Sequence, residues 1–245
     1  ASQTIHEFGT MVSRHGKTPV EFLAEVGFLG PMATIGHGIF IDQHPWINFS
    51  RHVDLDLLVS TCTTVAHCPT TQTRRAKMLR SFGGYMRAGV NMAIGVDIFP
   101  HNMIDEIRCA TVMGKVADRR MTALTASDVF YAATVGGANA LGRDDLGRID
   151  VGCKADIVLV DLDHPSMQPL YDPLRSLVFS GLERPVRDVY VNGKRVVADG
   201  VAVAINQAEL IHRVRKAQKA MFDRIPTLDW AGRTIIELLP PSMPI

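Results

Sequence analysis

The stretch Met92–Met103 reads Met-Ala-Ile-Gly-Val-Asp-Ile-Phe-Pro-His-Asn-Met, and it decides which fold the sequence predicts. Up to Val96 it is apolar and small or branched, without polar alternation, which is typical of a strand buried on both faces. Such strands belong to parallel sheets and barrels, whose catalytic side chains lie at the carboxyl ends of the strands. Asp97 occupies that position. A lone aspartate there is ordinarily a helix cap or a loop hydrogen bond, so its interpretation depends on the rest of the chain.

Two earlier apolar runs end in the same way. Residues 32–37 and 63–67 read as short strands, and they finish at His37 and His67. Together with Asp97, these residues recur every thirty positions, about the length of one strand–helix unit. A core histidine satisfied by hydrogen bonds would explain either histidine alone. Three titratable residues at the same end of three successive strands instead favour an active site on that face of a parallel sheet.

The segments around these strands predict helices. Thr18 is expected to cap a short helix that starts at Pro19, with Glu21 completing a capping box. Apolar periodicity predicts further helices over 52–60, 76–88 and 102–115. Ser127 is expected to cap a helix over 128–133. Alternation of strand and helix predicts a parallel α/β architecture.

The pattern changes after Gly142. Strands are predicted over 157–161, 186–191 and 194–198, and the Asn192-Gly193 pair between the last two is the favoured two-residue hairpin turn. The turns leave no room for crossover helices, so this part is expected to be a small antiparallel unit. A basic amphipathic helix over 209–224 and an irregular tail follow.

Composition narrows the function classes. Hydrophobic residues make up 47% of the 245 positions and charged residues 21%, so the chain can bury a sizeable core. Its length allows one large domain or two of ordinary size. The net charge of +1 gives no reason to expect nucleic acid or an acidic membrane as partner. The four cysteines show no Cys-x-x-Cys spacing, and neither a secretory signal nor an apolar run of about 18 residues is present. These features predict a cytoplasmic protein.

Five motifs share one family resemblance. They are His37-Gly38, His67-Cys68-Pro69-Thr70-Thr71-Gln72, Gly95-Val96-Asp97, the Leu-Gly-x-Ile-x-x-Gly-x-x-Ala-Asp run of Leu146–Val158, and Val191-Asn192-Gly193-Lys194. Together they resemble the amidohydrolase superfamily, in its branch of cytosine and adenosine-type deaminases and triazine chlorohydrolases. The resemblance runs through nearly all of the chain. A doubly wound oxidoreductase is disfavoured, since no Gly-x-Gly-x-x-Gly is present.

The resemblance implies an α/β fold: the C-terminal portion of a (β/α)8 TIM-type barrel plus part of a small β-sandwich. Residues 1–142 would form the partial barrel, from the end of strand five to helix eight. Residues 143–205 would form the C-terminal part of the sandwich, and residues 206–245 the C-terminal helix and irregular tail. The function implied is hydrolysis of a C–N or C–halogen bond in a nitrogen heterocycle or related amidine, so the substrate would be a small molecule. The resemblance also implies that the protein is a homo-oligomer.

The resemblance also implies roles for particular residues. One divalent metal, usually zinc, would be held partly by Asp97, which would also accept the proton of the attacking water. His37 would stabilise the anionic intermediate. His67 would contact substrate or support the site.

Two departures from the family pattern matter. Ala1-Ser2-Gln3 fits the three residues after the strand-five histidine, so Gln3 stands where relatives carry a proton-shuttling glutamate and would contact substrate instead. The family's His-x-His metal pair is absent from the chain, which we therefore expect to be the C-terminal part of a longer protein that needs its N-terminal segment. The alternative is a non-catalytic fragment or degenerate relative that only binds a ligand or partner.

Overall fold

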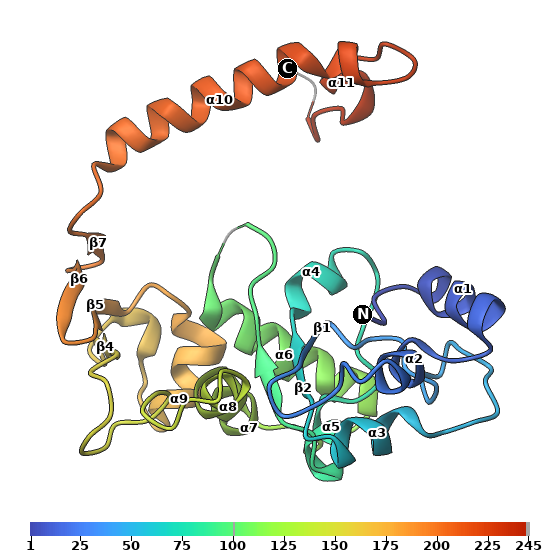
Figure 1. The fold of residues 1–245 in the computed structure, drawn as a ribbon. Helices are drawn as coiled ribbons and strands as arrows, with labels where there is room; N and C mark the ends of the chain where they lie inside the picture. Colours follow the sequence, from blue (N-terminus) through green and yellow to red (C-terminus); the bar gives the residue numbers. More distant parts are fainter. Residues whose placement is uncertain (100, 244–245) are drawn as a thin grey trace. The chain divides into compact units, whose positions relative to one another are not determined.

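A parallel sheet of three short strands organises the first part of the computed structural model (Figure 1). Strand β1 (Thr34–Gly36) pairs with β2 (Thr64–His67), and β2 pairs with β3 (Met92–Ile94). Ile35 lies opposite Val65, and His67 lies opposite Ile94. The expected parallel arrangement of these three strands is confirmed. Their carboxyl ends therefore lie along one edge of the sheet.

The structure describes residues 1–99 and 101–243, and these divide into two compact units, one up to residue 200 and the other from residue 201. The helices of the first unit are α1 (Ile5–His15), α2 (Pro19–Glu25), α3 (Asp54–Ser60), α4 (Pro69–Thr73), α5 (Phe82–Ala88), α6 (Met103–Asp118), α7 (Ala126–Tyr131), α8 (Gly137–Ala140) and α9 (Pro173–Ser176). Short 3₁₀ and π turns fill Ala132–Gly136, Pro165–Met167 and Leu177–Gly181. The domain boundaries expected at residues 142 and 205 stay predictions.

The helix starts follow the capping chemistry of the sequence in most places. The Thr18–Glu21 capping box before α2 is confirmed. Two predicted starts are wrong. The helix expected over 76–88 begins only at Phe82, because the Ser81 hydroxyl accepts from the backbone N–H of Gly84 and so fixes the first turn there. The cap of α7 is Thr125, not Ser127, and it forms a reciprocal box with Asp128.

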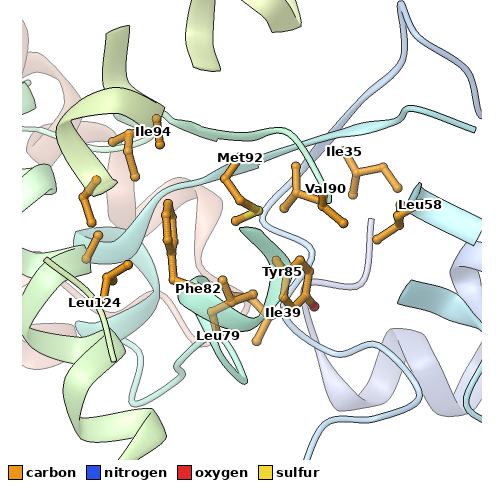
Figure 2. Packing of buried hydrophobic residues seen from close by; sticks show 14 of the residues in the cluster. Ile35, Ile39, Leu58, Leu79, Phe82, Tyr85, Val90, Met92, Ile94 and Leu124 are labelled. Carbon is orange, nitrogen blue, oxygen red and sulfur yellow. The ribbon is translucent and has the colours of Figure 1, made fainter. Parts of the chain in front are cut away.

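The core of this unit lies between the parallel sheet and the helices around it. Figure 2 shows Met92 of β3 gathered with Phe82 and Tyr85 of α5, and with Ile39 from the loop after β1. All four side chains are almost fully buried. The Tyr85 hydroxyl donates to the carbonyl of Gly38 at 2.9 Å, which ties α5 to the chain leaving β1. The closely packed core thus fixes the positions of the strand ends that carry His37 and Asp97.

A second sheet lies C-terminal to the first. Strand β4 (Ile157–Val160) pairs antiparallel with β5 (Val186–Val191), which pairs antiparallel with β6 (Lys194–Ala198). Asn192 and Gly193 both have positive φ, at 49° and 77°, as a type I′ hairpin turn requires. The predicted antiparallel unit and its turn are confirmed. The two sheets give a mixed α/β fold, whereas closure of the parallel strands into a barrel stays a prediction.

The second unit contains β7 (Val201–Ala202), the long helix α10 (Gln207–Leu228) and the short helix α11 (Ile235–Leu238). Helix α10 extends past the predicted end and includes Pro226 in its last turn. Within residues 1–99 and 101–243, no helix is both long and apolar enough to cross a membrane.

Candidate active site

His37 and Asp97 come together at the carboxyl edge of the parallel sheet. Nε2 of His37 lies 3.9 Å from Oδ2 of Asp97, although the residues follow different strands with β2 between them. This separation is too long for a direct hydrogen bond, so the two groups face each other across a narrow gap. The His37 side chain is 16% exposed and that of Asp97 is 41% exposed, so the pair is open to solvent on the carboxylate side. The strand-end argument predicted this proximity.

The backbone after β1 is what turns His37 toward Asp97. His37 has φ of 74° and the following Gly38 has φ of 54°, so two successive residues are left-handed. A non-glycine residue in this region is uncommon and marks a constrained turn. A Cβ on Gly38 would lie 2.8 Å from Cγ1 of Val65 on the neighbouring strand. The His-Gly pair therefore serves two needs: a sharp exit from the strand and a close approach to β2.

Gln72 holds the other side of the His37 ring. Its Nε2 lies 3.1 Å from Nδ1 of His37, and its side chain is fully buried on α4. Burial lowers the pKa of His37 below its usual value, and Asp97 only partly opposes this. In the sequence, Gln72 stands out only as the last residue of the motif that begins at His67. Its contact with His37 joins residues 35 positions apart, so no local pattern could have revealed it.

His67 is buried rather than open. Only 4% of the residue is exposed, its ring centroid lies 6.0 Å from that of Phe82, and burial lowers its pKa to about 3. Its Nδ1 has no hydrogen-bond partner among the described residues. The ring is therefore neutral near physiological pH. This setting suits the supporting role expected of His67, and contact with substrate stays a prediction.

The chain start lies beside the end of β1. The Gly38 N–H donates to the carbonyl of Ala1 at 3.3 Å, and the Ile39 N–H donates to the carbonyl of Ser2 at 2.9 Å. Gln3 follows directly, and its carbonyl accepts from Nζ of Lys77 at 3.3 Å. Residues 1–3 therefore run next to His37, as a neighbouring strand end would. The orientation that carries the Gln3 side chain toward or away from substrate stays a prediction.

A buried glutamate secures the helix that bears Gln72. Glu106 of α6 accepts the backbone N–H of Thr70 through Oε2 at 2.9 Å and so caps α4. It is 2% exposed, and burial raises its pKa. Sequence reasoning missed Glu106 because it reads as one more charged position on an amphipathic helix.

The described residues supply only part of a metal site. Asp97 offers one half-exposed carboxylate at a strand end, but no cluster of three or more His, Cys, Asp or Glu side chains able to hold a metal occurs within residues 1–99 and 101–243. Catalytic zinc ordinarily takes three protein ligands and keeps one open position. Asp97 fits the role of one ligand, and the others would have to come from outside these residues.

Comparison with protein families assigns the chain to one of them. The model of the amidohydrolase family matches residues 3–196, which contain His37, His67 and Asp97. The chain therefore belongs to the amidohydrolase family. A 5-methylthioadenosine/S-adenosylhomocysteine deaminase of Nitratidesulfovibrio vulgaris is 29% identical over 228 residues, covering 91% of this chain and 50% of its own. The corresponding deaminase of Natronomonas pharaonis is 33% identical over 203 residues, covering 81% and 45%.

Solved structures show the same relationship. An adenosine deaminase from Xanthomonas campestris with bound zinc superposes with a TM-score of 0.81 at 29% identity, covering 90% of this chain and 49% of its own. An atrazine chlorohydrolase from Arthrobacter aurescens TC1 with zinc gives a TM-score of 0.76 at 23% identity, covering 86% and 46%, which is likeness of fold alone. The chain spans about half the length of the relatives it matches, consistent with the expected C-terminal portion.

Proposed function

We propose that the protein containing this chain is a metal-dependent hydrolase that replaces the amino group or another leaving group of a nitrogen heterocycle with hydroxyl. The observation that carries the proposal is the convergence of His37 and Asp97, 3.9 Å apart, at the carboxyl edge of the sheet. The names of the family relatives support the reaction class, and the zinc bound to the adenosine deaminase neighbour supports the metal. When bound, a divalent metal would lower the pKa of an attacking water.

Each residue then has a definite task. Asp97 accepts a proton from the water as its oxygen bonds to the ring carbon. His37, neutral because burial lowers its pKa, donates its Nε2–H to the oxygen on which charge develops. The bond to the leaving group breaks, and a proton must reach that group. Gln3 cannot carry that proton near neutral pH, so the acid form of Asp97, which has taken the proton of the water, supplies it to the departing group.

The remaining ligands would come from the part of the protein that corresponds to the unmatched half of the relatives. Determination of the metal content of the intact protein tests this element of the proposal. About one zinc per chain is expected. A well-folded intact protein that binds no metal would favour the alternative of a non-catalytic ligand-binding module.

The catalytic test is Asp97→Asn in the intact protein. An amide binds metal poorly and accepts no proton, so two roles disappear together. We expect kcat to fall by more than the roughly 10²–10⁴-fold that one acid–base group contributes. Asp56→Asn is the matched control, because Asp56 is exposed on α3. Retention of a tenth of the wild-type rate by Asp97→Asn at saturating metal would contradict the assignment.

A further inference from the structure

Gln72 is the described residue whose side chain hydrogen-bonds to the imidazole ring of His37. The neutral imidazole has one donor nitrogen and one acceptor nitrogen, and the partner of one nitrogen fixes the role of the other. Among the described residues, the ring of His37 faces two polar side chains: Gln72 at Nδ1, 3.1 Å away, and Asp97 at Nε2, 3.9 Å away.

The carboxylate of Asp97 sets the direction of this arrangement. A protonated Nε2 presents a positive N–H dipole to the carboxylate, whereas an unprotonated Nε2 would present a lone pair to it. The first arrangement is favoured, and it leaves Nδ1 as the acceptor. Gln72 must then present its amide N–H₂ to Nδ1, with its carbonyl oxygen turned away.

Burial strengthens the preference. Gln72 is fully buried, so water does not compete for its amide, and hydrogen bonds in such surroundings are stronger than in solvent. The contact with His37 is the only hydrogen bond of the Gln72 side chain among the described residues, and its Oε1 is buried without a partner. The side chain therefore keeps an orphaned oxygen while it holds this one bond.

We propose that Gln72 is a positioning residue that keeps His37 in the Nε2–H tautomer, with its donor directed at the site of reaction beside Asp97. The inference rests on the proposed function for the meaning of that donor, but not for the hydrogen bond itself. Gln72 does not touch the reacting atoms, and it acts through His37. The wrong tautomer would present a lone pair where an oxyanion develops, so the cost falls on kcat more than on KM.

The test is ¹⁵N NMR of the imidazole nitrogens of His37 in the intact protein, with the signals assigned by their loss in His37→Asn. The wild type is expected to show Nε2 protonated and Nδ1 unprotonated. Gln72→Met keeps the length of the side chain but offers no donor to Nδ1, so a share of the Nδ1–H tautomer appears beside the Nε2–H form that Asp97 still favours. Gln72→Glu places an acceptor against the ring, so Nδ1 becomes protonated. This second variant decides the question if Gln72→Met fails to fold.

Turnover gives the second readout. Gln72→Met is expected to lower kcat about tenfold or more, as removal of outer hydrogen-bond partners commonly does, with a smaller change in KM. Thr71→Val is the matched control: Thr71 is buried on the same helix, and its hydroxyl has no partner among the described residues. It should leave the His37 signals and kcat unchanged.

The outcomes separate the two proposals. If the wild type is an active hydrolase but both Gln72 variants keep the wild-type His37 signals, or if their effects match those of Thr71→Val, the inference is overturned and the proposed function stands. If the wild type hydrolyses no aminoheterocycle while the signals move as expected, the proposed function fails and the role of Gln72 in setting the tautomer stands.

Discussion

At the scale of single residues, the site depends on complementary environments around one pair. His37 is partly enclosed and burial lowers its pKa, while Asp97 stays half exposed in the chain that follows β3. In the proposed mechanism these environments suit different tasks, hydrogen-bond donation by His37 and proton acceptance by Asp97. Gln3 is expected to add a third feature, a carboxamide at the position where the family resemblance implies an acid.

Gln3→Glu tests whether that difference selects the substrate. The two side chains are nearly isosteric, and Lys77 at the Gln3 carbonyl provides a nearby positive charge that favours the ionised carboxylate. We expect activity on the native substrate to fall, and any weak deamination of aminopyrimidines or aminotriazines to rise. The measurement is the ratio of kcat/KM for the two substrate classes before and after the change.

Gln168→Glu supplies the control for this exchange, because Gln168 is exposed in the first unit and bonds only to nearby backbone. Its kcat/KM ratio should match that of the wild type. The same unchanged ratio in Gln3→Glu would mean that the Gln3 side chain does not reach the pocket.

At the scale of elements, the strands were predictable and several helix starts were not. Three apolar runs that end near titratable residues indicated the parallel strands of this chain, because a strand buried on both faces shows no polar alternation. Helix starts depend on which of several nearby hydroxyls finds a backbone N–H, and Thr125 rather than Ser127 does so before α7. The contact between His37 and Gln72 could not be predicted from the sequence, since it depends on the position of α4 relative to the end of β1.

Gly38→Ala tests the turn that aims His37. The new Cβ would meet Cγ1 of Val65 at 2.8 Å, and φ of 54° disfavours any side chain. We expect a loss of about 2–4 kcal/mol in the free energy of unfolding from the backbone conformation and overpacking together. The urea midpoint of unfolding reports this loss.

Gly9→Ala makes the same chemical change where neither constraint applies. Gly9 lies inside α1, and a Cβ there meets nothing within 4 Å. Alanine is the better helix former by roughly 0.5–1 kcal/mol, so this variant should be slightly more stable than the wild type. Equal destabilisation by both changes would show that the fold does not depend on the positive φ of Gly38 or on its close approach to Val65.

At the scale of the whole molecule, a buried pair of aspartates connects segments far apart in the chain. Oδ1 of Asp54 accepts the Thr18 hydroxyl at 2.5 Å, and its Oδ2 accepts the Asp42 N–H at 2.9 Å. Asp42 in return accepts the N–H groups of Val53 and Asp54 through Oδ2. These bonds join the start of α2, the loop after β1 and the start of α3. The connection spans 36 residues and has no sequence signature.

The buried hydrogen-bonded pair of Asp42 and Asp54 should make the stability of the fold depend on pH. Burial raises the pKa of Asp54 to about 7, and the negative charges of Asp42 and Glu21 add to the rise, while hydrogen bonds from Thr18 and Asp42 oppose it. Between about pH 4 and pH 7 the folded protein therefore holds a proton on Asp54 that the unfolded chain has released. The stabilisation is complete below the unfolded pKa and is lost as pH rises through the folded value, at no more than about 1.4 kcal/mol per pH unit.

Asp54→Asn removes the titration but keeps an acceptor for Asp42 and a donor for Thr18. The variant and the wild type share every other titrating group, so the difference between their urea midpoints at each pH isolates Asp54. We expect that difference to shift in favour of the variant from pH 5 to about pH 7 and to level off between pH 7 and pH 8. Two parallel curves across this range would show that Asp54 is ionised in the folded protein throughout, and that its hydrogen bonds outweigh the cost of burial.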